Sequence, residues 1–187
     1  MLDKMKRHLS AVFAIVAGLV VSANAHTVLT TLFIDDATQG DGTCVRMPLD
    51  PESCTSPVEN VMSNDMACGV DGQMAVAFTC PAPAGGILTF EFREWADAEQ
   101  PGALDASHKG PCAIYAKQVH DIANDKAAGP GWFKLWDEGY DATTKKWCTE
   151  KLIDNNGLLS FEITRGPAGR LLALPSRVAC PTRGRQG

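Results

Sequence analysis

The chain has 187 residues, of which 45% are hydrophobic and 21% charged, with a formal net charge of −5 at pH 7. This length and apolar content suffice for one domain with a buried core. The acidic balance argues against a surface that binds nucleic acid or an anionic membrane through positive charge.

Residues 1–25 have the parts of a secretory signal peptide. Basic residues precede an apolar run over residues 11–21, and a small-residue Ala-Asn-Ala pattern ends at Ala25. The run has 11 residues, whereas roughly 20 are needed to span a bilayer, so we expect a secreted, extracellular protein without a membrane anchor. Cleavage after Ala25 would make His26 the first residue and change the net charge to −7.

The remaining chain alternates short apolar stretches with long polar loops. Residues 87–94 give the clearest strand signal, because apolar residues at 88, 90 and 92 alternate with polar residues at 89, 91 and 93. Residues 35–64 predict a long loop, residues 121–127 predict a helical turn, and residues 147–153 fit a helix or a strand. The expected strands are residues 28–34, 74–78, 87–94, 112–119, 132–136 and 158–163.

Several short strands without a long helical period predict an all-β fold, an antiparallel β-sandwich with long loops. We expect three segments: a signal peptide over residues 1–25, the sandwich over residues 26–163, and a divergent, poorly ordered tail over residues 164–187. The tail is rich in arginine, glycine and proline. We find no internal repeat and expect a monomer.

All seven cysteines follow the predicted signal peptide, and in a secreted chain cysteines most often form disulfides. The odd number leaves at least one without a partner in the same chain. Cys44 and Cys54 lie close in sequence and suggest a local disulfide. Cys112 and Cys148 would join two strands.

Two histidines predict a metal site. An N-terminal His26 would offer both its free amine and a ring nitrogen, and His108, at the end of a polar loop, would add a third nitrogen. Three nitrogens in a T arrangement suit the tetragonal preference of Cu(II) better than tetrahedral zinc. The alternative is that His26 is an incidental N-terminal residue and His108 an ordinary loop histidine. His120, beside Asp121, is expected at the surface.

Other chemistry-bearing residues have simpler structural explanations. Glu91, Glu94 and Asp97 resemble the carboxylate pair of a glycoside hydrolase, but strand alternation already accounts for Glu91. Four tryptophans could stack on sugar rings, and core packing is the default for most of them; these are Trp95, Trp132, Trp136 and Trp147.

The order and spacing of several motifs resemble the fungal lytic polysaccharide monooxygenases of auxiliary-activity family nine, formerly classed with the glycoside hydrolases. The matching motifs are His26-Thr27, Gly40-Asp41-Gly42, Asn64-Asp65-Met66-Ala67-Cys68, His108-Lys109-Gly110-Pro111 with Tyr115, Trp132-Phe133-Lys134-Leu135, and Lys151-Leu152-Ile153 with Asn156-Gly157. They extend from His26 to about residue 163.

The resemblance implies an immunoglobulin-like sandwich that carries one copper ion on a flat face. It implies oxidative cleavage of cellulose or a related β-1,4-glucan, with an external electron donor and O2 or hydrogen peroxide as co-substrate. His26 and His108 match the two copper-binding histidines of the family. In fungal members of the family, oxidation occurs at C1 or C4 of the glucosyl unit, and the first histidine is often methylated on its ring.

The chain departs from the family after residue 163. The family continues with a Leu-His pair and a Gln-x-Tyr or Gln-x-Phe block before a cysteine, and these supply the axial tyrosine and the oxidant pocket. Here no tyrosine follows Tyr140 and no histidine follows His120, as in a shortened or frame-shifted product. Because the family's usual disulfide joins Cys68 to the missing cysteine, Cys68 becomes the unpaired thiol unless Cys180 replaces its partner. The alternative functions are therefore an impaired product or a non-enzymatic copper- or carbohydrate-binding module.

Overall fold

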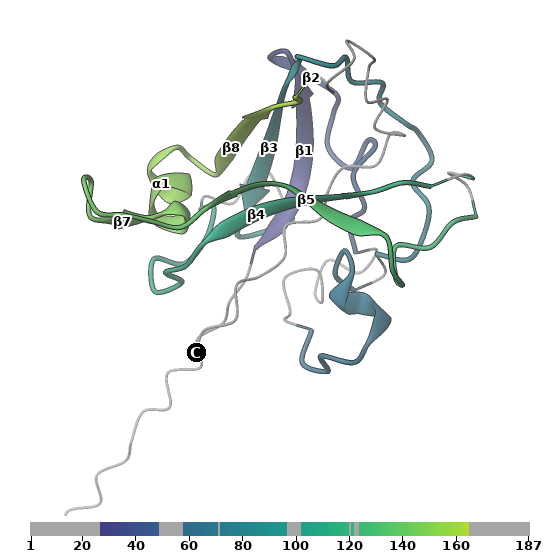
Figure 1. Cartoon of the computed structure of the whole chain (residues 1–187), viewed down its shortest axis with the longest axis horizontal. Helices are drawn as coiled ribbons and strands as arrows, with labels where there is room; N and C mark the ends of the chain where they lie inside the picture. Colours follow the sequence, from purple (N-terminus) through teal and green to yellow (C-terminus); the bar gives the residue numbers. More distant parts are fainter. Residues whose placement is uncertain are drawn as a thin grey trace, which may run out of the picture.

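A computed structural model describes residues 27–48, 58–70, 72–96, 102–119, 121 and 124–164. Strands dominate this part of the chain (Figure 1). The elements are β1 (Val28–Ile34), β2 (Ala37–Thr38), the 3-10 helix η1 (Asn64–Met66), β3 (Ile87–Arg93), β4 (Cys112–Lys117), β5 (Trp132–Glu138), β6 (Tyr140–Asp141), β7 (Lys146–Trp147), α1 (Cys148–Asp154) and β8 (Leu158–Glu162).

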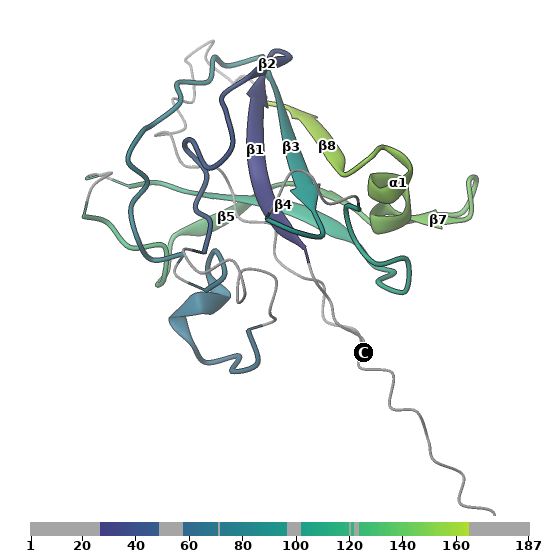
Figure 2. The ribbon, with the colours of Figure 1, turned by 180° about the vertical axis from the view of Figure 1, so that it is seen from behind.

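The strands form an antiparallel β-sandwich. A four-stranded sheet has the order β2-β1-β3-β8, and β4 pairs with β5 in a second, two-stranded sheet. The β4–β5 ribbon runs steeply across one face of the four-stranded sheet, in front of it in Figure 1 and behind it in the reverse view of Figure 2. The short pair β6–β7 projects beyond α1 at one end of the molecule.

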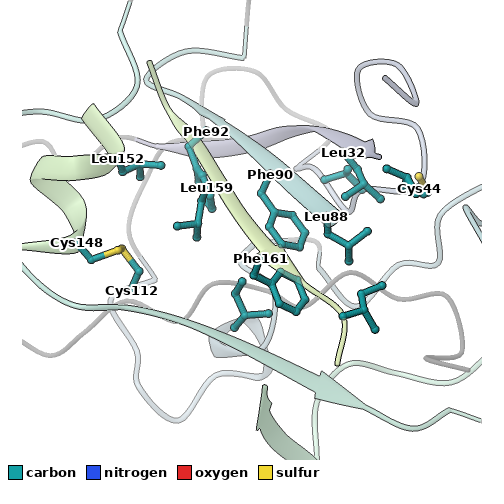
Figure 3. Packing of buried hydrophobic residues seen from close by; sticks show 14 residues of the cluster. Leu32, Cys44, Leu88, Phe90, Phe92, Cys112, Cys148, Leu152, Leu159 and Phe161 are labelled. Atoms are coloured by element: carbon teal, nitrogen blue, oxygen red, sulfur yellow. A yellow bond between two sulfur atoms is a disulfide. The ribbon is translucent and has the colours of Figure 1, made fainter. Parts of the chain in front are cut away.

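The core fills the space between the two sheets (Figure 3). Every second residue of β3 points into it, as the alternation in the sequence predicts, and Leu88, Phe90 and Phe92 are all at least 94% buried. The Phe90 ring stacks on Phe161 of β8 with centroids 6.0 Å apart. Ile114 of β4 closes the cluster from the second sheet.

The opposite face of β3 carries a polar network. Arg93 donates to Asp41 at 2.7 Å and to Glu91 at 2.9 Å, and Asp41 also accepts a hydrogen bond from Thr31 at 2.6 Å. The hydrogen bond from the Arg93 guanidinium is the main reason that the pKa of Asp41 lies below its usual value. Strand alternation therefore explains Glu91, as expected.

Most of the expected strands are confirmed, and β1 has the expected bounds. The strand expected over residues 74–78 is wrong: these residues form no strand, and Phe78 is 68% exposed. The proline-rich sequence that follows provides no neighbouring strand for them to pair with. Residues 148–154 form a helix, which resolves the ambiguity of residues 147–153. The expected turn near residue 121 includes a hydrogen bond from the Asp125 amide to the Asp121 carbonyl.

The disulfides differ in part from expectation. Cys44 bonds to Cys80 and not to Cys54, because the chain folds residue 80 back against the buried Cys44. Cys112 bonds to Cys148, as expected, although Cys148 begins a helix. Cys68 is disulfide-bonded, so the alternative in which it is the unpaired thiol is wrong. The other alternative, a bond to Cys180, stays a prediction because Cys180 lies outside the described residues.

The signal peptide expected over residues 1–25 and nearly all of the tail expected over residues 164–187 lie outside the described residues. Within the described ranges, no helix has the length and hydropathy needed to cross a bilayer.

Candidate metal centre

His108 lies in the segment that leads into β4, and a turn built by Asp105 holds it. The Asp105 side chain accepts a hydrogen bond from the Ser107 amide at 2.8 Å, and the Asp105 carbonyl accepts one from the His108 amide at 3.0 Å. The bonds from Ser107 also hold the pKa of Asp105 below its usual value. The backbone at His108 is therefore fixed by local hydrogen bonds.

The same turn orients the His108 ring. Its Nδ1 lies 3.3 Å from the Asp105 carbonyl oxygen. A carbonyl oxygen can only accept, so this contact is a hydrogen bond in the tautomer that carries its proton on Nδ1, and in that tautomer the lone pair lies on Nε2. This is the usual arrangement of a metal-binding histidine, in which the second ring nitrogen donates to a carbonyl or carboxylate.

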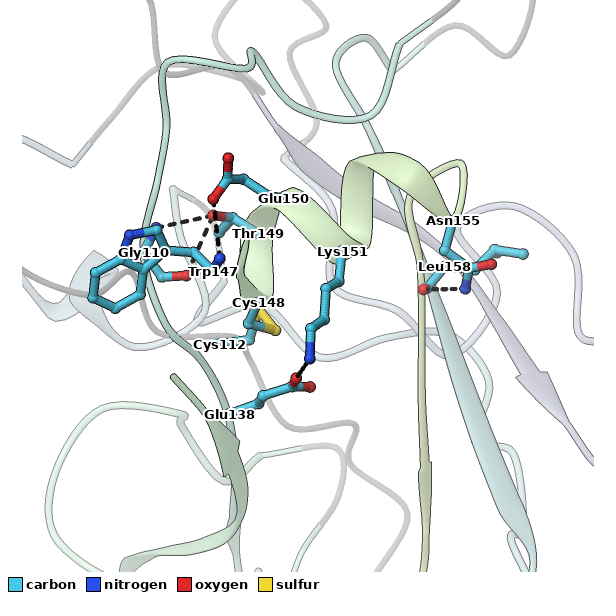
Figure 4. Close-up of a disulfide and its surroundings, with 10 residues drawn as sticks. All are labelled: Gly110, Cys112, Glu138, Trp147, Cys148, Thr149, Glu150, Lys151, Asn155 and Leu158. Carbon is cyan, nitrogen blue, oxygen red and sulfur yellow. Dashed lines mark hydrogen bonds and ion pairs between the residues drawn. A yellow bond between two sulfur atoms is a disulfide. The ribbon is translucent and has the colours of Figure 1, made fainter. Parts of the chain in front are cut away.

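On the other side of His108, the chain is attached to the start of α1 (Figure 4). The Gly110 amide donates to the Thr149 hydroxyl at 2.9 Å, and the Gly110 carbonyl lies 3.2 Å from both the hydroxyl and the amide nitrogen of Thr149. The Cys112–Cys148 disulfide lies next to these contacts. Residues 108–112 are thus held against a helix N-terminus.

Three neighbouring ion pairs add to the attachment of α1. Lys109 contacts Glu150 at 3.0 Å. The amide of Trp147 is the main reason, and Lys109 the second, that the pKa of Glu150 lies below its usual value. Lys151 bridges Glu138 and Asp141, which raises its own pKa, so that α1 is also tied to β5 and β6.

Thr27, the residue that follows His26, is held in place by its side-chain hydroxyl. Its hydroxyl donates to the Ala103 carbonyl at 2.8 Å and lies 3.3 Å from the Arg93 carbonyl. Ala103 begins the segment that leads to His108, so the start of β1 and this segment are in direct contact. His26 and His120 themselves lie outside the described residues.

The tryptophans considered as sugar-stacking residues make contacts within the protein. Trp136 packs against the core, Trp132 donates to the Ala127 carbonyl at 2.9 Å, and Trp147 contacts Tyr140 with ring centroids 5.3 Å apart. Trp95 is 45% exposed. Asp97 is not among the described residues, and the described part of the chain contains no cluster of three or more His, Cys, Asp or Glu side chains able to hold a metal.

Sequence reasoning missed Thr149 and the Asp105 turn. The Asp-x-Ser-His order around Asp105 is a turn signal that could have been recognised. No sequence signal connects Thr149 with Gly110, because they are 39 residues apart and meet only in the folded chain.

The profile of Auxiliary Activity family 9 (formerly GH61) matches residues 26–170. This range covers most of the chain and contains His26 and His108, the two predicted copper ligands. The chain belongs to Auxiliary Activity family 9. Its antiparallel sandwich agrees with that membership: the structure superposes on CvAA9A with a TM-score of 0.62 and 33% sequence identity, over 74% of this chain and 59% of that one.

Curated family 9 relatives are similar over most of this chain. The "AA9 family lytic polysaccharide monooxygenase C" of Aspergillus tamarii is 57% identical over 155 residues, and protein H of Botryotinia fuckeliana is 56% identical over 158 residues. These matches cover 82% and 84% of this chain but only 41% and 36% of the relatives. The chain thus spans about two fifths of the length of these relatives. Cel61B from Hypocrea jecorina, with a TM-score of 0.53 at 15% identity, shares the fold.

Of the two histidines expected to bind copper, the described residues include His108. The His108 ring has its Nδ1 beside the Asp105 carbonyl oxygen, and its side chain is 17% exposed, so that part of the ring reaches the surface. Neutral imidazole is a ligand that suits copper.

Proposed function

We propose that the chain is a secreted copper-dependent lytic polysaccharide monooxygenase that oxidatively cleaves cellulose or a related β-1,4-glucan. The observation that carries this proposal is membership in family 9, whose match to this chain begins at His26, the residue that signal cleavage would expose. The relatives from Aspergillus tamarii and Botryotinia fuckeliana are named as lytic polysaccharide monooxygenases.

Each histidine would have a distinct role at the metal. His26 would bind through its terminal amine and its ring, and His108 through Nε2, the nitrogen left with a lone pair by the contact with Asp105. Copper held by these three nitrogens would supply the one-electron chemistry that reduces O2 or hydrogen peroxide, with electrons from an external donor. The protein's part is to hold the two imidazoles at one place on the surface.

The contact between Thr27 and Ala103 supports convergence of the two histidines. It holds the residue after His26 against the start of the loop that leads to His108. Two observed disulfides among the described cysteines agree with an oxidising, extracellular location. We further propose that the protein acts as a monomer on the polysaccharide surface, with no nucleic acid or membrane partner.

The proposal is tested on protein secreted from a fungal host, so that the signal segment is removed. We expect one copper ion per chain and release of oxidised oligosaccharides from cellulose that requires both copper and a reductant. Two variants should lose both properties: His108→Ala, and a chain with one glycine added before His26, which converts the amine to an amide. The extended chain keeps the His26 ring, so a loss of copper binding there would show that the terminal amine is needed in addition to the ring.

A processed, folded and copper-loaded protein that releases no oxidised product from any β-glucan would contradict the monooxygenase proposal. Because that protein holds copper without turnover, the result would support the non-enzymatic binding module instead, and a cellulose-binding assay would show whether the module also binds the polysaccharide. Circular dichroism of each variant checks that the sandwich is intact, so that a loss can be assigned to the site.

A further inference from the structure

Three consecutive residues at the start of α1 each hold a residue close to His108. Cys148 is bonded to Cys112 and Thr149 is hydrogen-bonded to Gly110 (Figure 4). Glu150 is paired with Lys109. The two segments are therefore antiparallel, and the first turn of α1 lies alongside residues 109–112. Nothing in the fold alone requires this turn to contact the loop at three successive positions.

Thr149 makes the most specific of these contacts. Its hydroxyl can accept from the Gly110 amide and donate to the Gly110 carbonyl at the same time, since a hydroxyl has one proton and two lone pairs. The Thr149 amide adds a third contact, at 3.2 Å from the same carbonyl. This amide belongs to the first turn of α1, where helix amides have no partner within the helix.

The other two contacts constrain the His108 ring less. Lys109 is 57% exposed, and exposed ion pairs contribute little to conformational preference. The disulfide is four residues from His108 and joins side chains without contacting the backbone between them. Thr149 binds both polar backbone atoms of Gly110, only two residues from His108.

The Asp105 turn fixes the chain on the opposite side of His108, through the hydrogen bond from the His108 amide to the Asp105 carbonyl. That carbonyl also contacts His108 Nδ1. The direction of the ring therefore depends on how residues 105–110 are held as a unit. Release of the Gly110 end would let the His108 backbone rotate away from the position in which Nδ1 reaches the carbonyl.

We propose that Thr149 is a positioning residue for His108: by holding both backbone polar groups of Gly110, it keeps the His108 ring in the orientation that directs Nε2 toward the metal. The proposal deepens the proposed function and rests on it for the identity of the metal. Thr149 does not touch the metal itself and acts only through the segment that it holds.

The test compares Thr149→Val, which keeps the side-chain shape and removes the hydroxyl, with Thr149→Ser, which restores it. Thr143→Val serves as the matched control, because Thr143 is an exposed threonine in the loop between β6 and β7. In metal-free protein at a fixed pH, amide exchange at Gly110 and the 15N signals of the His108 ring are measured. Cu(II) affinity is measured by calorimetry, and thermal unfolding is recorded for every variant.

In Thr149→Val we expect about tenfold faster exchange at Gly110, a smaller fraction of the Nδ1–H form of His108, and Cu(II) affinity lower by about tenfold or more. Thr149→Ser and Thr143→Val should match the wild type in all three. Affinities are compared at a temperature where every variant is fully folded, so that a purely structural role of Thr149 would change the melting temperature and leave the ring signals unchanged.

The proposal is overturned if Thr149→Val exchanges faster at Gly110 while the His108 ring signals stay as in the wild type. It is also overturned if Thr149→Ser shows the same loss as Thr149→Val. A wild-type protein that binds no copper would count against the proposed function, and the metal-free ring signals would still decide whether Thr149 positions His108.

Discussion

The hydroxyl of Thr27 donates a 2.8 Å hydrogen bond to the carbonyl of Ala103, 76 residues away in the sequence. This bond joins the residue after His26 to the beginning of the segment that ends at His108. The two parts of the chain that carry the predicted copper ligands are therefore connected by a direct contact at the edge of the sandwich.

Replacement of Thr27 by valine should weaken this connection. The variant keeps the shape of the side chain and loses the hydrogen bond to Ala103, so we expect the free energy of unfolding to fall by about 1 kcal/mol and Cu(II) binding by the processed chain to weaken. Urea unfolding and calorimetry measure the two effects. Thr27→Ser, which retains the hydroxyl, should behave as the wild type; equal copper affinity in both variants would show that this contact does not hold His26 in place.

The disulfides Cys44–Cys80 and Cys112–Cys148 form a matched pair, because both join residues 36 apart. Loop-closure entropy of the unfolded chain then predicts that alanine replacement of either pair lowers the free energy of unfolding by a similar amount, about 2–4 kcal/mol. Only the Cys112–Cys148 replacement should also lower copper affinity, since only that bond adjoins the His108 segment. Comparable losses of copper affinity in both double variants would contradict this assignment.

Asp41→Asn should change how stability depends on pH. Arg93 and Thr31 lower the pKa of Asp41 in the folded protein, whereas in the unfolded chain an aspartate titrates near pH ~3.9. The unfolded state therefore binds more protons in this range, and the stabilisation from Asp41 is present above that pH and lost as the pH falls through the folded pKa. Urea unfolding between neutral and acid pH should show the wild type more stable than Asp41→Asn at neutral pH, with a difference that shrinks in acid. A constant difference would contradict the ionic origin.

Gly157→Ala should be strongly destabilising. Gly157 has φ +83°, and an added Cβ would lie 2.1 Å from the carbonyl oxygen of Phe92, a backbone atom of the central strand β3. The backbone conformation alone should cost about 1–3 kcal/mol, and the clash adds to that. Gly139→Ala is the control, because a Cβ there meets no atom within 4 Å. Thermal unfolding measures both variants; similar melting temperatures would mean that the turn before β8 adapts freely.

Local sequence patterns were sufficient for much of the fold. The alternation of residues 87–93 and the β-branched, apolar composition of residues 28–34 predicted β3 and β1, because strand formation on a half-buried sheet depends on which residues recur with period two. Residues 74–78 are also apolar and form no strand. A strand needs a partner, and composition does not report whether one is available.

The sequence by itself determined which functional groups the chain contains: a cleavage pattern before His26, a histidine at position 108, cysteines suited to disulfides, and the motifs of family 9 in their order. Only the tertiary structure decided that Cys44 bonds to Cys80 and that Thr149 holds Gly110. The reason is physical. Preferences over a few residues are encoded by their own side chains, whereas a contact across 36 or 39 residues depends on how every intervening segment packs.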